Sequence, residues 1–515
     1  MNGFEAKILS HYHFGEEDRA FLFGAPSLSL IPSIDGDIAV EKAKARILSS
    51  IERHEKVIVY GDYDCDGIMA TSILVYCFHR LGHALASYIP SRYQDGYGLN
   101  KENAVKIADA GYSLVILADN GVSCLNEIEY LSSRGIDTIV IDHHNLGEAL
   151  PSCYALIHPK TLNYGSQDVS AGFLSYLFSR CLLGQNDPYL LELGALSLLS
   201  DLMPLKDHNR TAVRLLLQQV NDHLNQPFSL LLDHPSDPID EKTLGMELIP
   251  CINAVGRLAT GHEAQRLVHY FALDAKDKMG SIAAYMKQTN ARRKELTIQA
   301  GEKLSIDDSL PGVCVLVDLP EGLNGLLANR LMKQTHKPCA VFSSSQSEPG
   351  CYVGSLRSEE GFSVVCFYEE AKPLLKKCGG HEKAGGLTIE KEDYPAFKEL
   401  FLAYCKSHPF TKNEDLIPLE LSECTVENYR ILLSYGPFGM GYEEPTFLLR
   451  SLDSSRFGYT RDNKYLSTFL SPDVKLFSFE LGKKDFVDGG NVDLKAKFVW
   501  NRYGNKENLD IRLSR

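Results

Sequence analysis

Three short apolar runs in the first third of the chain each end in an acidic turn, and this pattern strongly constrains the fold. Val57–Tyr60, Leu114–Leu117 and Thr138–Ile141 are continuous runs of β-favouring residues, as in strands buried on both faces of a parallel sheet. Helical patterns lie between them, at Ile68–Leu81 and Leu125–Ser133. Alternating strands and helices predict βαβ units and a doubly wound α/β sheet.

The acidic turns follow the carboxyl ends of these strands, where open parallel sheets bind their ligands. We therefore expect residues 60–66, 119 and 142–144 to converge, although they are far apart in the sequence. A later apolar helix, expected at Glu192–Leu202 before Pro204, could cap the same edge.

These positions offer a set of candidate metal ligands: Asp64, Asp66, Asp119, His143 and Asp201. Carboxylates with few imidazoles and no thiolate favour Mn2+ or Mg2+. Two such ions, ~3.5–4 Å apart, could share a bridging carboxylate and activate water for attack on a phosphoryl group. A single Asp at a strand end is usually a helix cap or a turn former. Three acidic strand ends at one sheet edge are hard to obtain from capping alone.

The ordered motifs resemble the DHH phosphoesterase superfamily, which is named for the triplet found here as Asp142-His143-His144. Asp62–Gly67, Asp119–Gly121 and Ser200–Leu205 are similar to its first, second and fourth motifs. Over nearly its whole length, the chain resembles the RecJ-type family of single-strand-specific 5′ exonucleases. The resemblance implies hydrolysis of single-stranded DNA with release of 5′-mononucleotides, in DNA recombination and repair.

The resemblance also implies roles for the ligand set. One metal would be held by Asp64 and Asp119, and the other by Asp66, Asp119, His143 and Asp201. The implied cofactor is Mn2+ or Mg2+, with two ions in each active site.

Two neighbouring residues complete this implied site, and a third departs from the family pattern. Asp62 would be a supporting carboxylate, and His144 would orient or protonate near the scissile phosphate. Some branches of the superfamily have a metal-binding histidine where this chain has Tyr60, which leaves the first metal with fewer protein ligands.

Two segments resemble phosphate-binding motifs of the family. Asn253–Leu258 is similar to a segment with a phosphate-binding arginine, and Gly354–Ser358 to a second one in the DHH-associated domain, whose glycine-rich loop follows at Cys378–His381. Arginine binds phosphate bidentately, and glycines let backbone N–H groups approach an anion. The candidates for binding the 5′-phosphate and the strand are Arg92, Asn253, Arg257, Ser355, Arg357, Gly380 and His381.

A terminal phosphate held in this way would place the first internucleotide bond over the metals. Arg92 lies in Ser91–Gly98, which resembles a segment lining the nucleotide path. Tyr93 and Tyr97 in this segment could stack on bases or could be packing residues. At Leu319–Gly322 the Trp-His of many relatives is absent, so the role of that histidine cannot be carried over.

The last hundred residues have a different pattern, with turn residues between short strand-like runs. The expected strands are Tyr465–Leu470, Val474–Leu481, Val492–Trp500 and Leu509–Leu513, and the expected turns are residues 488–491 and 501–505. This predicts a small β-barrel or sandwich, and it resembles the OB-fold domain of the family. Such folds bind single strands through basic grooves and aromatic side chains. The candidates here are Lys495, Lys497, Trp500, Arg502 and Tyr503.

The chain has 515 residues, which is too long for one ordinary domain. We expect an N-terminal segment with the DHH domain at 1–215, a helical connector at 216–305 that includes a long helix within 262–303, a smaller α/β DHH-associated domain at 306–410, and an OB-like β-barrel at 411–515. The net charge of −14 argues against a protein that coats DNA, so basic residues should be concentrated in a cleft.

The cellular setting follows from what the sequence lacks. Its 13 cysteines show no Cys-x-x-Cys pair, as in reduced cytosolic proteins. No apolar stretch long enough for a membrane span and no secretion signal are apparent, so we expect a cytoplasmic protein. Single-stranded DNA is the expected partner, and a single-strand-binding protein and a helicase are candidate protein partners.

Two other functions remain open at this point. The chain could be a DHH phosphodiesterase of short oligonucleotides or cyclic dinucleotides, although such relatives generally lack the C-terminal β domain. It could also be a non-catalytic single-strand-binding scaffold, because some DHH relatives have lost metal ligands. The complete ligand set argues against the scaffold.

Overall fold

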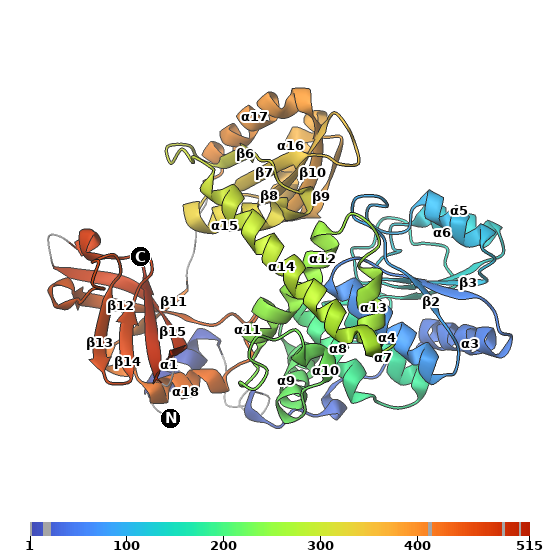
Figure 1. Ribbon diagram of the computed structural model, residues 1–515, viewed down its shortest axis with the longest axis horizontal. Coiled ribbons are helices and arrows are strands. Elements are labelled where there is room, and N and C mark those ends of the chain that lie inside the picture. Colours follow the sequence, from blue (N-terminus) through green and yellow to red (C-terminus); the bar gives the residue numbers. More distant parts are fainter. Residues whose placement is uncertain (1–2, 14–21, 410–414, 487–489, 504–505) are drawn as a thin grey trace. The chain divides into compact units, whose positions relative to one another are not determined.

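The computed structural model describes residues 3–13, 22–409, 415–486, 490–503 and 506–515. The chain forms two compact units, one of residues 27–412 and one of residues 1–26 with 413–515. The larger unit contains two sheets with the helices that link them, and the smaller unit contains a third sheet (Figure 1). None of the described helices is long and apolar enough to cross a membrane.

The first sheet is parallel throughout and has the strand order β2-β1-β3-β4-β5. In sequence, the strands are β1 (Val57–Tyr60), β2 (Ala86–Tyr88), β3 (Leu114–Ala118), β4 (Asp137–Ile141) and β5 (Ala155–Ile157). The three strands expected from the apolar runs are confirmed, and every residue of β1 and β3 is buried. The strand order reverses between β1 and β3, which is where open α/β sheets form ligand clefts.

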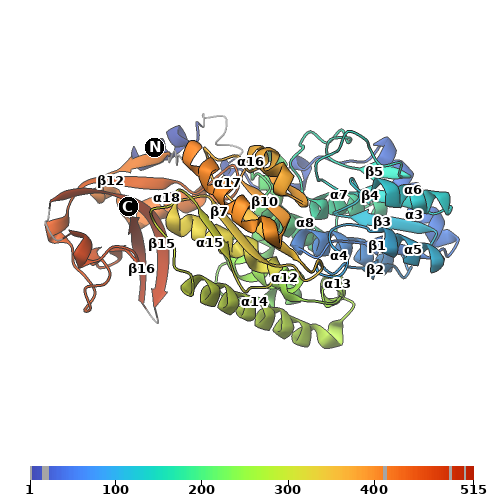
Figure 2. The same ribbon diagram turned by 90° about the horizontal axis from the view of Figure 1, so that it is seen from above.

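Helices cover both faces of this sheet (Figure 2). On one face lie α4 (Cys65–Arg80) and α7 (Ala171–Leu183), with α8 (Pro188–Ser200) packed against both. On the other face lie α5 (Lys101–Asp109) and α6 (Leu125–Ser133), which contact each other. Two further helices of this part are α3 (Ile38–Glu52) and α9 (Asp207–Asp222).

The connector between the two sheets is built from helices. In order, they are α10 (Gln226–Ser229), α11 (Glu241–Thr243), the π-helical η2 (Leu244–Leu248), α12 (Ile249–Leu258), α13 (Gln265–Phe271) and α14 (Met279–Glu302). The expected long connecting helix is present as α14, but it begins only at Met279, because the chain turns after α13, where Leu273 has a positive φ of 61°. Helix α14 leads from this region to the second sheet (Figure 1).

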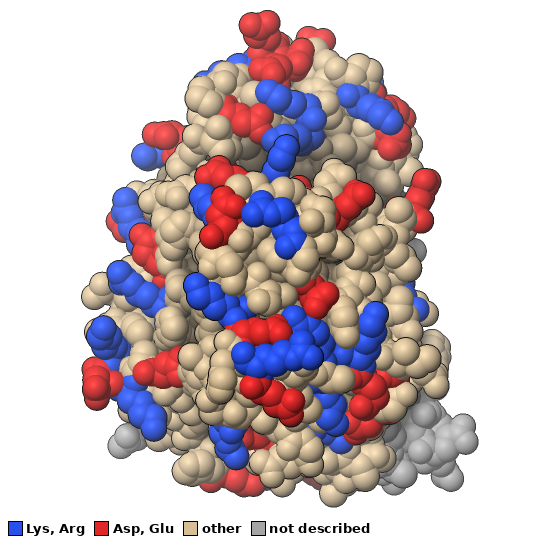
Figure 3. Space-filling model, turned by 90° about the vertical axis from the view of Figure 1, so that its right-hand side faces the viewer, with Lys and Arg blue, Asp and Glu red and all other residues tan. Residues whose placement is uncertain are grey.

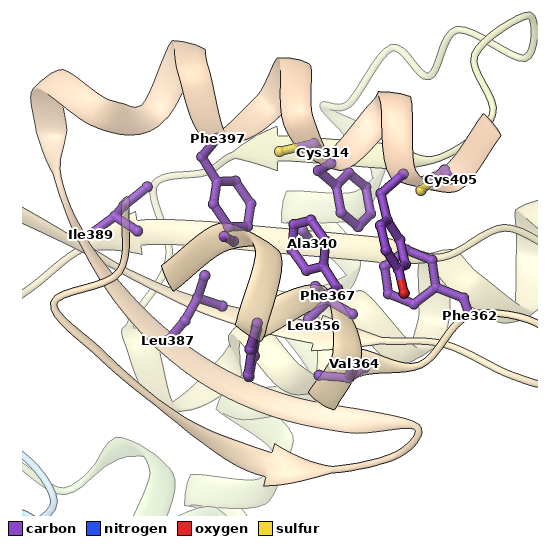
Figure 4. Packing of buried hydrophobic residues seen from close by; sticks show 14 of the residues in the cluster. Cys314, Ala340, Leu356, Phe362, Val364, Phe367, Leu387, Ile389, Phe397 and Cys405 are labelled. Carbon is purple, nitrogen blue, oxygen red and sulfur yellow. The ribbon is translucent and has the colours of Figure 1, made fainter. Parts of the chain in front are cut away.

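The second sheet has the order β6-β7-β8-β10-β9. Its strands are β6 (Val313–Leu316), β7 (Cys339–Ser344), β8 (Cys351–Arg357), β9 (Lys377–His381) and β10 (Ala384–Glu390), and its helices are α15 (Asn324–Thr335), α16 (Val364–Ala371) and α17 (Tyr394–Ser407). Phe367 of α16 and Phe397 of α17 pack face to edge over this sheet, in a core rich in aromatic side chains (Figure 4). The glycine-rich segment expected as a loop is instead the β9–β10 hairpin.

The smaller unit is a six-stranded sheet of order β11-β12-β15-β16-β14-β13. Its strands are β11 (Leu416–Leu419), β12 (Thr446–Asp453), β13 (Ser467–Ser471), β14 (Val474–Phe477), β15 (Asn491–Tyr503) and β16 (Lys506–Ser514), and its helices are α1 (Gly3–His11) and α18 (Val426–Ser434). Helix α1 belongs to this core, because its Phe4 ring stacks 5.5 Å from that of Phe447 and 5.9 Å from that of Phe498. The four expected strands are present, and the expected turn residues 488, 489, 504 and 505 lie outside the described residues.

Candidate metal centre and phosphate site

Residues 61–66, which join β1 to the first turn of α4 and which we call the metal-binding turn, carry two hydrogen-bonded carboxylates at the carboxyl edge of the first sheet. Asp64 is the N-cap of α4, and its Oδ1 accepts a hydrogen bond from the Gly67 backbone N–H at 3.2 Å. The two carboxylate oxygens of Asp66 accept hydrogen bonds from the N–H groups of Ala171 and Gly172, at 2.9 and 2.7 Å. These groups form the N-terminus of α7, and its positive end stabilises the Asp66 anion.

Asp119 follows β3 in a left-handed backbone conformation, with a φ of 63°. Such conformations are uncommon for residues with side chains and cluster at functional sites. The Tyr97 hydroxyl donates to the Asp119 carbonyl oxygen at 3.2 Å. Among the described residues, the buried Oδ1 atoms of Asp119 and Asp62 accept no hydrogen bond, so each is available to a cation.

His143, directly after β4, lies between carboxylates from three different elements. Its Nε2 is 3.5 Å from Asp66 Oδ2, 3.4 Å from Asp119 Oδ1 and 3.4 Å from Asp201 Oδ2. Asp201 reaches this position because it is the C-cap of α8. The structure thus brings together the residues that the sequence predicts as ligands.

The ligand atoms form groups within 4.8 Å of one another, and two of these groups share no residue. The first, which we call the imidazole subsite, consists of Asp66, His143 and Asp201. The second, the carboxylate subsite, consists of Asp62, Asp64 and Asp119. A third group joins Asp119, His143 and His144.

The electrostatics of these subsites favour a bound cation. Burial, together with repulsion from Asp64, raises the pKa of Asp66 to about 7. Burial and repulsion from Asp66 raise the pKa of Asp201 to about 8. Burial likewise raises the pKa of Asp62 and of Asp119 well above the usual range. Because buried, unneutralised carboxylates are costly, this oxygen-rich set with an imidazole fits a divalent cation such as Mn2+ or Mg2+.

Asp142 orients the histidines and is not part of either subsite. Its Oδ1 accepts hydrogen bonds from the backbone N–H groups of His143, at 2.7 Å, and His144, at 3.1 Å. The same oxygen accepts a hydrogen bond from the ring nitrogen Nδ1 of His144 at 2.8 Å. Its Oδ2 accepts one from the Val122 backbone N–H at 3.0 Å. Burial opposes ionisation of Asp142, but these hydrogen bonds lower its pKa to about 2. Burial also opposes a charge on His144, but the bond to Asp142 raises the His144 pKa to about 9.

Arginines lie beside the metal-binding turn. The Arg92 guanidinium carbon is 4.2 Å from the centroid of the Tyr63 ring, and Arg92 Nε donates to the Gly256 carbonyl at 3.3 Å. Arg257 Nη1 donates to the Gly322 carbonyl of the second α/β domain at 3.2 Å. Burial, followed by repulsion from Arg92, lowers the pKa of Arg257 to about 10. A partly buried cation of this kind, with no carboxylate paired to it among the described residues, has a strong affinity for an anion.

The second α/β domain places the predicted phosphate contacts Ser355 and Arg357 at the start of α15. A side-chain carbon placed on Gly325 would lie 2.7 Å from Arg357 Nη2 and 3.5 Å from Ser355 Oγ, so the α15 N-terminus lies against both groups. Arg357 Nη1 donates to the Leu356 carbonyl at 2.8 Å, and burial lowers the pKa of Arg357. In the part of the chain that the structure describes, neither Arg257 nor Arg357 forms an ion pair.

Helix α12 carries Asn253 and Arg257 and packs directly on the metal-binding turn. Asn253 Oδ1 accepts a hydrogen bond from the Cys65 backbone N–H at 2.8 Å, so this oxygen positions the turn. A side chain would not fit at Gly256, because a Cβ there would lie 2.1 Å from the Tyr63 carbonyl oxygen. Helix α12, which carries Arg257, and the metal-binding turn are therefore held in contact.

Gly380 and His381, also predicted as phosphate contacts, lie in the exposed strand β9. Burial and the charge of the neighbouring His144 lower the pKa of His143 to about 4, against the opposing effect of Asp142. On the face shown in Figure 3, basic and acidic side chains are interspersed. The half-buried Arg92, Arg257 and Arg357 offer a local positive site in a chain with a net charge of −14.

Comparison with known proteins shows matches along most of the chain. Three family models match it in order: the DHH family N-terminal domain at residues 56–187, the DHHA1 domain at 312–407 and the RecJ OB domain at 417–515. The chain belongs to the RecJ branch of the DHH family. The three matched ranges correspond to the three sheets described above.

Curated members of the RecJ family carry the name single-stranded-DNA-specific exonuclease RecJ. The protein from Bacillus subtilis is 28% identical over 92% of this chain and 63% of its own length. The Escherichia coli protein is 28% identical over 79% of this chain and 77% of its own length. The chain thus spans less than two thirds of the B. subtilis relative.

Solved RecJ structures share the fold. RecJ from Thermus thermophilus in complex with Mn2+ has a TM-score of 0.83 and 24% identity, over 99% of this chain and 75% of that chain. An exonuclease RecJ bound to manganese has a TM-score of 0.63 and 25% identity, over 74% of this chain and 97% of that chain. These matches confirm the predicted architecture of a parallel-sheet domain, a second α/β domain and a C-terminal OB-like domain.

Two further residues support the site: Tyr97, predicted only as a possible stacking or packing residue, and Asn120, which was not predicted. Tyr97 Oη lies 3.1 Å from His144 Nδ1. Asn120 Nδ2 donates to the carbonyls of Tyr60, Gly61 and Ala118, which ties together the ends of β1 and β3. A role for Asn120 could have been predicted from its position, because it directly follows Asp119 at the end of a predicted strand.

The two tyrosines of the predicted nucleotide path differ in their surroundings. Tyr93 is 7% exposed, and its hydroxyl donates to the Arg257 carbonyl at 2.5 Å, so it is a packing residue. Tyr97 is 47% exposed beside His144 and remains a candidate for contact with the substrate.

Tyr60, which occupies the position of a possible histidine ligand, is engaged elsewhere. It is fully buried, its ring stacks on that of Tyr88 at 5.1 Å, and its hydroxyl donates to the Gly98 carbonyl at 3.2 Å. Among the described residues, the carboxylate subsite therefore contains no imidazole from this position.

Proposed function

We propose that the chain is a metal-dependent exonuclease that removes 5′-mononucleotides from single-stranded DNA, in recombination and repair. The observation that carries this proposal is the direct contact between the metal-binding turn and the arginine-bearing helix α12, made through Tyr63 and Gly256. This contact fixes the distance between the proposed hydrolytic centre and the proposed phosphate site. The names of the RecJ relatives support the same function.

The metal centre would hold two Mn2+ or Mg2+ ions, one in the imidazole subsite and one in the carboxylate subsite. When bound, divalent ions supply Lewis-acid activation of water and stabilise charge on the phosphoryl oxygens. Asp119 belongs to the carboxylate subsite and also lies 3.4 Å from His143, so it is placed to serve both ions. Asp142 holds the His144 ring beside the substrate position, where His144 contacts or protonates the scissile phosphate.

The phosphate site would bind the 5′-phosphate and fix the direction of digestion. Arg92, Arg257 and Arg357 supply the cations, and Ser355 and the start of α15 supply neutral donors. Asn253 would act mainly by holding the metal-binding turn. Gly380 and His381 on the neighbouring hairpin complete the set of proposed strand contacts.

The proposed reaction breaks one P–O bond in each cycle. Water attacks the phosphorus between the first and second nucleotides, and the 3′ oxygen of the first nucleotide leaves with a proton. A 5′-mononucleotide is released, and the shortened strand keeps the phosphate as its new 5′ end. That end can enter the same arginine site, which accounts for stepwise digestion. A helicase and a single-strand-binding protein are the candidate partners that would supply single strands.

The test uses the full chain with Mn2+ and single strands labelled at either end. We expect a 5′ label to appear at once as mononucleotide, while a 3′-labelled strand shortens gradually. A strand that is degraded only from its 3′ end would refute the proposal. Cleavage of a cyclic dinucleotide, which has no 5′ end, in preference to the linear strand would instead support the short-substrate phosphodiesterase.

A further inference from the structure

A fully buried histidine, His158, lies at the carboxyl edge of the first sheet and belongs to neither metal subsite. It directly follows β5, so it lies at the same edge as the residues that follow β1, β3 and β4. A buried polar side chain is costly unless its polar groups are paired. The partners of the two ring nitrogens therefore indicate what this histidine does.

Each ring nitrogen of His158 has a backbone partner that fixes its hydrogen-bonding role. The Lys160 backbone N–H donates to Nδ1 at 3.1 Å, and Nε2 lies 2.9 Å from the His144 carbonyl oxygen. A backbone N–H can only donate and a carbonyl oxygen can only accept, so Nδ1 is unprotonated and Nε2 carries the proton. Burial lowers the pKa of His158, which favours this neutral form. His158 is therefore a hydrogen-bond donor to the backbone of His144.

The backbone that carries this donor is itself held in place. The His158 carbonyl oxygen accepts hydrogen bonds from the N–H groups of Thr161 and Leu162, at 2.9 and 3.0 Å. The preceding Ile157 carbonyl accepts one from the Asp142 N–H at 3.2 Å, which ties the end of β5 to the end of β4. The imidazole of His158 is thus attached to a fixed part of the sheet edge.

Both backbone polar groups of His144 are bonded to side chains. Its N–H donates to Asp142 Oδ1 at 3.1 Å, and its carbonyl oxygen accepts from His158 at 2.9 Å. The His144 ring adds a third bond, from Nδ1 to Asp142 Oδ1 at 2.8 Å. Because β4 ends at Ile141, these side-chain bonds hold His144 where the strand no longer does. The position of the His144 ring therefore depends on Asp142 at one peptide group and on His158 at the other.

We propose that His158 is a positioning residue for the cleavage reaction: its Nε2–H holds the His144 carbonyl and so sets where the His144 imidazole meets the scissile phosphate. His158 is fully buried, so it acts through His144 and not by touching the substrate. This inference rests on the proposed function, in which His144 contacts or protonates that phosphate. If His158 only stabilised the turn that it begins, its loss would have no effect specific to His144.

Hydrogen–deuterium exchange of the full chain tests the contact without any turnover. His158→Leu removes both ring nitrogens, so we expect the backbone amides of His143 and His144 to exchange faster than in the wild type. His158→Gln keeps an N–H that reaches about as far from the backbone, so exchange should stay at the wild-type rate. Unchanged exchange in His158→Leu would overturn the proposal. If that variant does not fold, His158→Met takes its place, because methionine adapts to irregular space.

A double-mutant cycle of cleavage rates tests whether His158 acts through His144. His158→Leu should lower kcat by about 10–100-fold, the range typical of residues that orient the groups around a metal, with little change in KM. In a His144→Ala background the same substitution should cause no further loss, because residues that act as one unit are not additive. An equal loss in both backgrounds would overturn the proposal. His158→Gln should restore kcat, and a Gln variant as slow as the Leu variant would argue against the hydrogen bond.

His408→Leu is the matched control, because His408 Nδ1 also lies beside a backbone carbonyl oxygen, that of Tyr404, at 3.2 Å, but at the end of α17 in the second α/β domain. We expect this variant to keep the wild-type cleavage rate and the wild-type exchange at His144. A loss as large as that in His158→Leu would overturn the proposal. If the wild-type chain cleaves no strand, the proposed function fails, while the exchange measurement still decides whether His158 holds His144.

Discussion

Gly256→Ala tests whether contact between α12 and the metal-binding turn sets the geometry of the site. The added Cβ would lie 2.1 Å from the Tyr63 carbonyl oxygen, whereas real Cβ contacts essentially never fall below 3.0 Å. Both groups belong to backbone segments, so the helix and the turn must separate by roughly 1 Å. A misplacement of about this size can cost about 100-fold in rate, and overpacking typically costs about 1–3 kcal/mol of stability.

The assay combines single-turnover cleavage of a 5′-phosphorylated strand with thermal unfolding. We expect Gly256→Ala to lose about 100-fold in the cleavage step, because Arg257 moves away from the metal ligands. Gly280→Ala is the matched control: it lies in α14 with no heavy atom within 4 Å of the added Cβ. Replacing a helical glycine by alanine should leave activity unchanged and stabilise the fold by about 0.5–1 kcal/mol. Wild-type cleavage by Gly256→Ala would refute the reasoning.

The remaining predictions concern single groups of the site. Asp119→Ala should abolish cleavage, with a loss larger than the about 100-fold typical of residues that only surround a metal. In a chelator the variant should unfold at a temperature no lower than that of the wild type, because the substitution removes a buried carboxylate. Near-normal turnover would contradict the bridging role of Asp119. Arg357→Ala should weaken binding to 5′-phosphorylated strands by about 10-fold or more and hardly affect 5′-hydroxyl strands; equal weakening on both would argue against the phosphate site. Mn2+ at about 100 times its dissociation constant should stabilise the fold by about 2.7 kcal/mol, measured by thermal unfolding, and His143→Ala should reduce this shift.

The sequence was most informative where a local pattern determines the structure. Continuous apolar runs identified β1, β3 and β4, because strands buried on both faces have no polar alternation. The parallel arrangement then implied that Asp64, Asp119 and His143 would meet at one edge, as the structure shows. The end of a buried β-strand fixes the position of the residues that directly follow it, so their convergence could be predicted from the sequence.

Other features depend on long-range packing that leaves little local signal. The association of α1 with the C-terminal core rests on Phe4, which lies more than 400 residues from its partners Phe447 and Phe498. The break between α13 and α14 depends on the positive φ of Leu273, which helix propensity does not reveal. Which face of the C-terminal sheet each side chain occupies could not be predicted, because the residue period of these strands assigns their faces only weakly.

The central claim is that the carboxylates and His143 form two metal subsites. Crystals of the full chain grown with Mn2+, measured by anomalous diffraction at the manganese edge, test it most directly. We predict two anomalous peaks, one among Asp66, His143 and Asp201 and the other among Asp62, Asp64 and Asp119. Manganese found at neither subsite, or only at other carboxylates, would contradict the account.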